Sequence, residues 1–353
     1  MAKWEENVRK VVPYTPGEQP NQPGMIKLNT NENPYPPSPM VEKVLHEFNT
    51  DKLRLYPDPT NGSLVYALAE CYNVKPSQVF VGVGSDDVLA LCFLTFFNSK
   101  KPILFPDITY SFYDVWADLF RIPYEDQPLD ENMCIRKEDY MKENGGVIFA
   151  NPNAPTGVAM ELSEIEEIVA SNTDVICIVD EAYIDFGGTS ALPLIEKYDN
   201  LLVVQTFSKS RAMAGSRIGY VFGNERLIQY LNDVKYSFNS YTMDQVTLAT
   251  GVAAIRDDAY FKETLNRVIA TRERMKKELS ELGFTMPDSK SNFLFISHPQ
   301  VPAKYLLDEL RKRNIFVRYF AKPRIDNMLR VSIGTDDEMD RFLACVKEII
   351  ASA

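Results

Sequence analysis

Histidine is scarce in this chain, since His46 and His298 are the only two among 353 residues. So few imidazoles argue against a histidine-rich metal site or a histidine-centred catalytic triad, and we expect no bound metal. The five cysteines are scattered, odd in number and never closely spaced, which is typical of reduced thiols rather than of a disulfide framework or a zinc site. No apolar run is long enough to span a bilayer, and residues 1–10 carry no recognisable signal peptide. We therefore expect a cytoplasmic protein with no membrane partner.

Basic residues are also outnumbered. Lysine and arginine number 38 against 49 aspartate and glutamate residues, for a formal net charge of −11. Nucleic acids bind to basic surfaces, so this balance argues against a nucleic-acid partner. It still allows a local basic pocket for a small anion. At 353 residues the chain is long enough for a large core and for two domains.

The first part of the chain differs in composition from the remainder. Four prolines within the first 23 residues rule out a long helix there, so residues 1–28 are expected to form an extended arm. From residue 79 onward, short apolar runs alternate with helical patterns, which predicts βαβ units and a mostly parallel sheet. The expected buried strands are 79–83, 102–105, 146–150, 175–179, 201–206 and 218–222. One helix is expected at "SEIEEIVAS", where Ser163 and Glu166 would form a capping box.

The pattern changes after about residue 235. Two long helices are expected at 244–256 and 258–282, and the second would join the two parts of the chain. The later elements are expected to be a strand at "NFLFIS", a helix at 304–313, strands at "NIFVRYF" and "MLRVSIGT", and a last helix from Asp337. The sequence thus predicts an arm at 1–28, a large domain at 29–240 and a small α+β domain at 241–353.

The motif "VFVGVGSDD" leads an expected strand into an expected helix. Gly82 and Gly84 would let the backbone approach a ligand closely. A helix that begins near Ser85 and Asp86 would present free N–H groups and the positive end of its dipole, which together favour a phosphate. The alternative is an ordinary strand-to-helix turn. The motif lacks the Gly-Lys-Ser/Thr of a nucleotide P-loop and the third glycine of a dinucleotide fingerprint.

Two further strands are followed by side chains that suit a flat, polar ligand. Tyr110, in "ITYSFYDVW", would stack on such a ligand, and the alternative is an ordinary core or surface aromatic. Asn153, in "FANPNAPTG", would donate a hydrogen bond from a rigid loop, and the alternative is a simple turn.

The next two strands end in groups of opposite charge. In "VICIVDEAYIDF" an apolar run ends at Asp180, with Tyr183 three residues on, and in "TFSKSRAMAGSRIGY" Lys209 and Arg217 follow the next strand. A carboxylate at a strand end is costly to bury unless it has a cation or strong donors. A protonated ring nitrogen would satisfy Asp180. The alternative is a structural ion pair with Lys209 or Arg217.

Ligands of open α/β sheets bind beyond the carboxyl ends of the strands, so these groups are expected to surround one ligand. Together they match the needs of pyridoxal phosphate. A lysine forms the Schiff base, and a carboxylate keeps the pyridine nitrogen protonated. A phenol and an amide bind the ring oxygen, and the helix end takes the phosphate.

The chain resembles the fold-type I pyridoxal-phosphate aminotransferases of class II over nearly its whole length. The motifs that carry the resemblance are "LNTNENPY", "YPDP", "GVGSDD", "NPNAPTG", "VDEAYIDF", "FSKSRAMAGSRIGY" and "LRVSIGT". The early "NxNENP", the "YPDP" and the spacing of Arg318 and Arg330 are similar to the histidinol-phosphate branch. The resemblance implies a mostly parallel α/β sheet with helices on both faces, a large cofactor-binding domain and a smaller α+β domain.

The resemblance also implies roles for the candidate cofactor residues. Lys209 would be the Schiff-base lysine and proton shuttle. Asp180 would pair with the pyridine nitrogen, Tyr183 and Asn153 would contact the ring oxygen, and Tyr110 would stack on the ring. The residues expected around the cofactor phosphate are Gly84, Ser85, Asp86, Ser208 and Arg217.

Other residues would serve the substrate and the second subunit. Tyr56 would reach the cofactor phosphate of the other subunit, which implies a homodimer with shared active sites. The residues expected to bind the substrate are Tyr14, Asn33, Arg318 and Arg330, of which the tyrosine and the arginines would hold its anionic end.

The implied reaction moves the amino group of L-histidinol phosphate to 2-oxoglutarate, giving imidazole acetol phosphate and glutamate, as a step of histidine biosynthesis. Two alternatives share the scaffold, namely an aromatic-amino-acid aminotransferase and a threonine-phosphate decarboxylase. A more distant alternative is a protein that binds pyridoxal phosphate without catalysis. The intact Lys209, Asp180 and Tyr183 argue against it.

Overall fold

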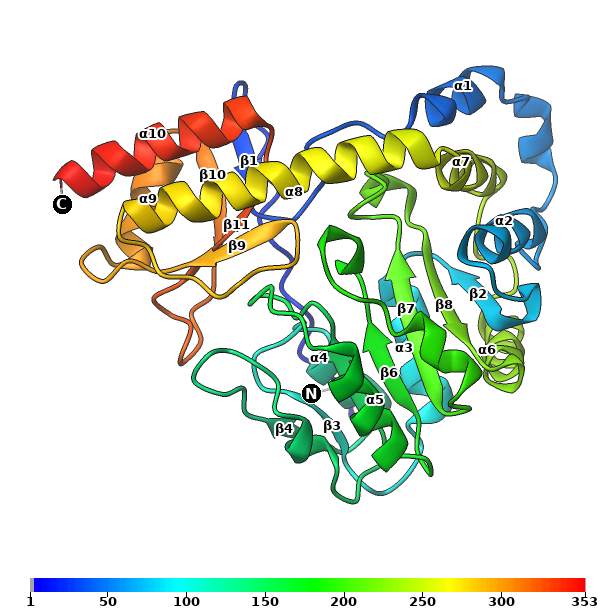
Figure 1. Cartoon of the computed structure of the whole chain (residues 1–353). Coiled ribbons are helices and arrows are strands. Elements are labelled where there is room, and N and C mark those ends of the chain that lie inside the picture. Colours follow the sequence, from blue (N-terminus) through cyan, green and yellow to red (C-terminus); the bar gives the residue numbers. More distant parts are fainter. Residues whose placement is uncertain (1–2, 353) are drawn as a thin grey trace.

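The structure, a computed structural model, describes residues 3–352 and has a seven-stranded sheet as its largest feature (Figure 1). The strand order in this large sheet is β2-β8-β7-β6-β5-β3-β4. The strands are β2 (Val79–Gly82), β3 (Ile103–Pro106), β4 (Tyr124–Gln127), β5 (Val147–Ala150), β6 (Cys177–Asp180), β7 (Leu201–Thr206) and β8 (Gly219–Gly223). Within residues 3–352, no helix combines the length and the apolar character needed to cross a membrane.

The large sheet is mostly parallel, as expected. Strands β4, β3, β5, β6 and β7 run parallel to one another, whereas β8 is antiparallel to both β7 and β2. Six of the seven strands are buried along their whole length, which explains why they are unbroken apolar runs in the sequence. The exception is the edge strand β4, whose polar sequence YEDQ is largely exposed and did not predict a strand.

Helices cover both faces of the large sheet. The first seven are α1 (Pro39–Glu47), α2 (Gly62–Tyr72), α3 (Ser85–Phe96), α4 (Tyr113–Phe120), α5 (Leu162–Ser171), α6 (Glu225–Phe238) and α7 (Gln245–Arg256). Helices α2, α5 and α7 share one buried cluster with Cys177 and Val179 of β6, whereas α3, α4 and α6 share another with Ile178. Because successive side chains of a strand point to opposite faces, the two clusters lie on opposite sides of the sheet.

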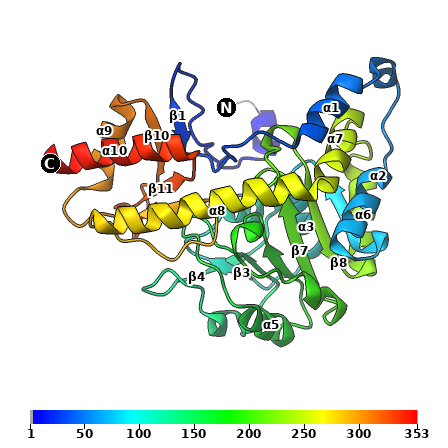
Figure 2. The ribbon, with the colours of Figure 1, turned by 45° about the horizontal axis from the view of Figure 1, so that its top comes forward.

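A second, four-stranded sheet has the order β1-β10-β11-β9, and we call it the small sheet. Its elements and covering helices are β1 (Ile26–Leu28), β9 (Phe293–Ile296), β10 (Ile315–Tyr319), β11 (Leu329–Ser332), α8 (Asp258–Glu281), α9 (Ala303–Lys312) and α10 (Asp336–Ser352). The long helix α8 runs from beside α7 to the small sheet (Figures 1 and 2), as the sequence predicted for a joining helix. Strand β1 pairs in parallel with β10, so the expected arm ends as a strand of this sheet.

Short 3-10 turns link several of these elements. They are Lys3–Asn7, Thr50–Arg54, Pro76–Gln78, Lys137–Tyr140, Ile184–Phe186, Leu192–Glu196 and Ala214–Ser216. The division of the chain after residue 240 stays a prediction. Helix α7, which follows that point, packs against α1 and α2 and contributes Leu248 and Ala253 to the core beneath the large sheet.

Two local expectations fail against the structure. The capping box of Ser163 and Glu166 is wrong, because α5 begins at Leu162 and its N-cap is Glu161, without a side-chain hydrogen bond. Ser163 therefore lies inside the first turn, and Glu166 instead accepts hydrogen bonds from Lys197 and Tyr198 on the surface. Helix α6 was not predicted.

Two glycines bring the start of α3 directly against β8. A Cβ atom built at Gly219 would lie 2.2 Å from the carbonyl carbon of Gly84 and 2.3 Å from the amide nitrogen of Ser85. Gly84 has a φ of +86°, a backbone conformation that side chains disfavour. The close approach places the first N–H groups of α3 at the edge of the sheet where β6 and β7 end.

Gly219→Ala should destabilise the fold. The added methyl group meets backbone atoms, which no rotation of a side chain can move, so we expect a loss of about 1–3 kcal/mol in the free energy of unfolding. Gly215→Ala is the matched control, because nothing lies within 4 Å of its built Cβ. The control should stay within about 0.5 kcal/mol of wild type. Urea titrations of the three proteins measure both values, and an equally stable Gly219→Ala variant would contradict the proposed close packing.

Candidate active site

A cavity of about 370 Å³, here called the central cavity, lies at the carboxyl ends of β5, β6 and β7. Its walls include much of the predicted set: Ser85, Asp86, Tyr110, Asp180, Tyr183, Ser208, Lys209 and Arg217. These residues are far apart in the sequence, and they meet because parallel strands bring their carboxyl ends to one edge of the sheet. The predicted strand-end residues therefore share one cavity.

One end of the central cavity is suited to an anion. Helix α3 begins after Gly84 without a side-chain cap, so its first N–H groups are available to a ligand. A Cβ at Gly84 would lie 2.5 Å from Nη2 of Arg217 and would fill this space. The guanidinium of Arg217 lies 3.4 Å from Oγ of Ser208. Helix N–H groups, a guanidinium and a hydroxyl together form a cradle with phosphate-binding chemistry.

Asp86 and Tyr110 occupy the rim of this cradle. The Asp86 carboxylate accepts hydrogen bonds from Nη2 of Arg217 at 3.0 Å and from the Tyr110 hydroxyl at 2.7 Å. Burial, with the Asp86 charge beside it, raises the pKa of the Tyr110 phenol, so this group stays a proton donor. An anion bound in the cradle would share Arg217 with Asp86. The Tyr110 ring forms a wall of the cavity.

Asp180 reaches the central cavity at the end of β6 and is 4% exposed. Its carboxylate accepts hydrogen bonds from the Tyr113 hydroxyl at 2.8 Å and from the Ala182 N–H at 3.2 Å. Burial raises the pKa of Asp180 to about 6. Within residues 3–352 it forms no ion pair with Lys209 or Arg217, so the structural ion pair considered from the sequence is not formed. The carboxylate lacks a cationic partner.

Lys209 lies in the wall of the same cavity, with Nζ 5.6 Å from the centroid of the Tyr183 ring. Across the described part of the chain, Nζ has no hydrogen-bond or ion-pair partner. The Asn33 amide donates to the carbonyl groups of Lys209 and Ser210, both at 3.1 Å. Asn33 thus holds the loop that carries the lysine, and its expected contact with substrate stays a prediction.

Asn153 is buried, and its amide is fully engaged by protein groups. Its Nδ2 donates to the Ile108 carbonyl at 2.9 Å and to Oγ1 of Thr156 at 3.3 Å, while its Oδ1 accepts from Oγ1 of Thr109 at 2.8 Å. A contact with a ligand's ring oxygen would require one of these bonds to be exchanged. That contact therefore stays a prediction.

A smaller cavity of about 160 Å³, here called the arginine cavity, adjoins the central cavity and shares Tyr110, Tyr183 and Lys209 with it. Arg318 of β10 and Arg330 of β11 lie in its walls and are direct cross-strand neighbours. Like charges placed in this way repel each other. Neither arginine pairs with a carboxylate within residues 3–352, and burial, with Arg318 adding to it, lowers the pKa of Arg330.

Arg330 is only partly satisfied by the protein. Its Nη2 donates to the Asn29 carbonyl at 3.1 Å, while its buried Nε has no partner in the described chain. The surface carboxylate of Asp336 is not its partner, since Asp336 pairs with Arg274. Two guanidiniums without a counterion predict that an anion binds between them.

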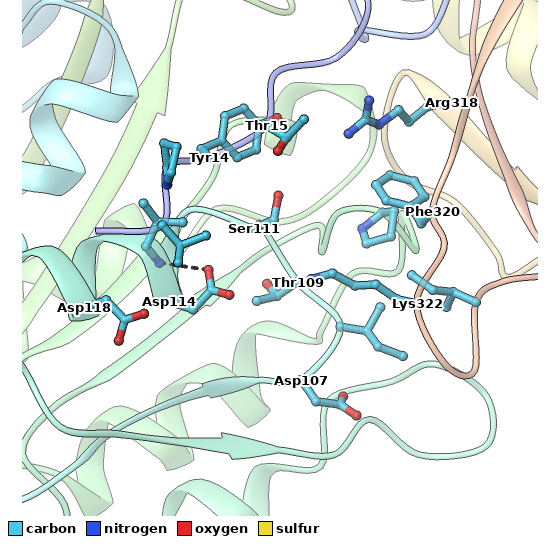
Figure 3. Close-up of a pocket in the computed structure, with 16 residues that line it drawn as sticks. Tyr14, Thr15, Asp107, Thr109, Ser111, Asp114, Asp118, Arg318, Phe320 and Lys322 are labelled. Carbon is cyan, nitrogen blue, oxygen red and sulfur yellow. Dashed lines mark hydrogen bonds between the residues drawn. The ribbon is translucent and has the colours of Figure 1, made fainter. Parts of the chain in front are cut away.

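A third cavity, of about 310 Å³, extends outward from the arginine cavity (Figure 3). Tyr14 of the arm stacks on Phe112 with ring centroids 4.1 Å apart and forms part of its wall. The Arg318 guanidinium lies at one side of this space, and Asp114 and Asp118 of α4 lie at the other. Tyr14 and Arg318 thus line the same cavities, and their expected contact with the substrate stays a prediction.

Tyr56 lies apart from these cavities on the surface of the single chain. It is 82% exposed, and its ring packs 4.8 Å from that of Tyr241. Its expected contact with a phosphate in the other subunit stays a prediction.

Two residues of the site were missed from the sequence. Tyr113, which binds Asp180, is the first residue of α4, and its place in "ITYSFYDVW" shortly after a strand was the available signal. The ring centroid of Phe320 lies 5.4 Å from Cζ of Arg318 and 5.5 Å from Cζ of Arg330. Its spacing of two residues from Arg318 predicts a shared strand face and was the available signal.

Comparison with known proteins gives three findings. Residues 23–346 match the family described as aminotransferase class I and II. The chain is 51% identical over 347 residues to the histidinol-phosphate aminotransferase of Lactococcus lactis subsp. cremoris, covering 98% of each chain. It is 52% identical over 348 residues to that of Clostridium acetobutylicum, covering 99% of each.

The fold itself is similar to a crystal structure of histidinol-phosphate aminotransferase from Sinorhizobium meliloti in complex with pyridoxal-5'-phosphate. The TM-score is 0.84 at 24% sequence identity, and the match covers 93% of this chain and 91% of that chain. This likeness confirms the expected fold class, a mostly parallel α/β sheet with helices on both faces.

Asp180→Asn should stabilise the protein once bound small molecules are removed. Burial raises the pKa of Asp180 from 3.8 to about 6 in the folded chain. The folded state therefore binds the proton more tightly than the unfolded state, and its stability falls as the pH rises from about 4 to about 6. Above pH 6 the ionised carboxylate costs on the order of 2–3 kcal/mol, which the amide removes.

The measurement is a series of urea titrations between pH 4.5 and 8. The variant should be more stable than wild type at pH 8, and the difference should shrink steadily below pH 6. Asp51→Asn, at an exposed aspartate, should stay within about 0.5 kcal/mol of wild type throughout. A less stable Asp180→Asn variant at pH 8 would mean that the carboxylate already has a cationic partner.

Proposed function

Because this chain belongs to the class I and II aminotransferases, we propose that it moves the amino group of L-histidinol phosphate to 2-oxoglutarate, with pyridoxal phosphate as cofactor. The products are imidazole acetol phosphate and glutamate, and the pathway is histidine biosynthesis. The observation that carries the proposal is the cross-strand pair Arg318 and Arg330, which has no counterion within residues 3–352 and lies beside the unpaired amine of Lys209.

The central cavity fits pyridoxal phosphate by its chemistry. The uncapped start of α3, Ser208 and Arg217 would hold the phosphate, and Gly84 leaves the space for it. Asp180, which lacks a cation, would pair with the protonated ring nitrogen. Bound there, the cofactor supplies an electron sink for the electron pair left when the substrate loses its proton.

Asp180 would contribute an ionised carboxylate as the partner of the ring nitrogen. A cationic partner would oppose the effect of burial and lower the pKa of Asp180 again, so the pair would hold both charges at neutral pH. The Tyr113 hydroxyl and the Ala182 N–H fix the carboxylate in place, so little reorganisation is needed when charge develops during the reaction.

Lys209 contributes its free amine. No described carboxylate holds Nζ, so this amine is free to reach the substrate carbon that bears the amino group, and there it would take a proton and return it elsewhere. Asn33 limits the movement of the loop through its bonds to the Lys209 and Ser210 carbonyls.

Arg318, Arg330 and Tyr14 contribute substrate selection. Guanidiniums bind phosphate oxygens through several charge-assisted hydrogen bonds, so a phosphate monoester suits this pair. An amino acid would place its carboxylate there instead, which is how an aromatic-amino-acid aminotransferase would use the same scaffold. A threonine-phosphate decarboxylase differs in the bond that it breaks.

A homodimer with shared active sites is part of the proposal. Tyr56 packs against Tyr241, and both side chains are exposed, as are those of Leu53 and Leu55 just before Tyr56 in the sequence. A large exposed apolar patch is typical of an interface. A second copy of the chain would bury this surface and bring Tyr56 to its partner's cofactor phosphate. Cytoplasmic location is also proposed, on the scattered free cysteines.

Histidinol phosphate should far outpace unphosphorylated histidinol as amino donor, and Arg318→Ala or Arg330→Ala should shrink this gap. Charge-assisted hydrogen bonds are worth about 1.5–3 kcal/mol each, so either substitution should lower kcat/KM for the phosphorylated donor roughly 10- to 100-fold. The activity with histidinol should change little. Arg136→Ala, whose side chain pairs with Asp139 on the surface, is the control and should match wild type.

The same assay includes phenylalanine and threonine phosphate. Phenylalanine as the best donor would replace the proposal with an aromatic aminotransferase. Release of carbon dioxide from threonine phosphate would replace it with a decarboxylase. Absence of transamination with every donor would favour a binding protein without catalysis.

Mixing Tyr56→Ala and Lys209→Ala chains should restore activity, although each variant alone should be nearly inactive. A mixed dimer has one site that combines an intact Lys209 with an intact Tyr56 from the other subunit. Random mixing should therefore recover about a quarter of the wild-type activity. Lys209→Ala mixed with Asp180→Ala is the control, because both residues would belong to the same subunit's site and no intact site can form. Verified mixed dimers without activity would argue against shared sites.

A further inference from the structure

The segment Asn29–Asn31 lies between the small sheet and the central cavity. It follows β1, and its polar groups are bonded on one side to residues of the small sheet and on the other to Tyr183. Asn31 is 1% exposed and has no assigned role in the reaction proposed above. A buried polar side chain needs partners, and those of Asn31 connect two parts of the site.

The backbone of Asn31 is held by the small sheet. Its N–H donates to Oγ of Ser332 at 2.9 Å, and its carbonyl accepts from Nδ2 of Asn292 at 2.9 Å. Its φ is +57°, in the left-handed region that asparagine tolerates better than most residues. This backbone conformation would suit a glycine as well as an asparagine, so it does not explain why the residue carries an amide side chain.

The side chain of Asn31 has a defined orientation. The Ser332 hydroxyl donates to Oδ1 at 3.1 Å, which leaves Nδ2 to donate to the Tyr183 hydroxyl at 3.0 Å. The Tyr183 oxygen thus accepts from Asn31, and its own hydrogen has no acceptor within residues 3–352. That hydrogen is available to point into the central cavity, which Tyr183 lines.

The same segment also contacts Arg330 of the arginine cavity. Arg330 and Ser332 are two residues apart on β11, so they share one face of that strand. Arg330 donates to the Asn29 carbonyl, while Ser332 binds Asn31. The ring of Tyr183 also packs edge-on against Phe293 of β9, with centroids 5.1 Å apart. A movement of the small sheet that follows anion binding would therefore reach Tyr183 through this segment.

We propose that Asn31 is a positioning residue that fixes the Tyr183 hydroxyl as a donor toward the cofactor and ties this orientation to the strand that carries Arg330. The inference rests on the proposed function, because it takes the ligand of Tyr183 to be the ring oxygen of pyridoxal phosphate. Asn31 also lines the arginine cavity, but the role proposed here runs through its hydrogen bond to Tyr183.

Two substitutions separate the side chain from the backbone. Asn31→Gly keeps the left-handed conformation and both backbone hydrogen bonds, but removes the donor to Tyr183. Asn31→Asp keeps the acceptor for Ser332 but places a carboxylate oxygen where the N–H donor was. The Tyr183 hydroxyl would then donate to that oxygen instead of toward the cavity. Asn73→Gly is the matched control, because Asn73 is a surface asparagine with a φ of +53°.

The first readout is the binding of pyridoxal phosphate to apoenzyme, followed by fluorescence, together with the absorbance spectrum of the bound cofactor. Loss of one correctly directed hydrogen bond should raise the cofactor dissociation constant about 3- to 10-fold in Asn31→Gly. Asn31→Asp should do so at least as strongly, with a shifted absorbance maximum. Asn73→Gly should leave both unchanged, and urea titrations establish that all variants are folded.

The second readout is a double-mutant cycle with Tyr183→Phe. If Asn31 acts through the Tyr183 hydroxyl, then Asn31→Gly should change cofactor binding less than about twofold in the Tyr183→Phe background. An undiminished effect there, or normal binding and absorbance in Asn31→Gly alone, would overturn the inference while leaving the proposed function intact. A wild-type chain that binds no pyridoxal phosphate would overturn the proposed function and the inference together.

Discussion

Asp180 ends a buried strand with two neutral donors at its carboxylate, the Tyr113 hydroxyl and the Ala182 N–H, and without a cation in the described chain. Burying a charge in this way is unfavourable, and the rise of its pKa to about 6 reflects that cost. In the adjoining cavity, Arg318 and Arg330 are cross-strand neighbours, and neither pairs with a carboxylate of the described chain. Unpaired charges of both signs along connected cavities are best understood as a site that its ligands complete. The proposed cofactor supplies the cation for Asp180, and the proposed substrate supplies the anion for the arginines.

The fold keeps these charges apart by strand register and by glycine. Arg217 is held by Ser208 and by Asp86 at the start of α3. That start lies against β8 because Gly84 and Gly219 have no side chains. In the arginine cavity, the strand register of the small sheet fixes the positions of the arginines. A slip of one residue between β10 and β11 would turn Arg330 to the opposite face and remove it from the cavity. Because strand register and backbone packing set the positions of these charges, a single side-chain substitution cannot shift them.

The sequence predicted the residues whose position depends on strand ends, because parallel strands bring such ends together whatever the loops do. Asp180 and Lys209 are examples, and the alternation of apolar runs with helical patterns predicted the sheet around them. The sequence did not predict that β8 is antiparallel to its neighbours, since an apolar run does not indicate the direction of a buried strand. The sequence also did not predict which groups are hydrogen-bond partners. The amide of Asn153 is engaged by Thr109 and the Ile108 carbonyl, and this depends on loop paths that local sequence does not encode.

The short segment after β1 has a consequence for how substrate choice can change in such a scaffold. Its carbonyl at Asn29 binds Arg330, and its side chain at Asn31 binds Tyr183, so one stretch of backbone contacts both the anion site and the proposed cofactor site. Replacing Arg330 to accept a different anion would free the Asn29 carbonyl and loosen the segment that holds the Tyr183 hydroxyl. Interacting residues of this kind are not independent in their energetics. A change of substrate would therefore require compensating changes in this segment, which itself lines the arginine cavity.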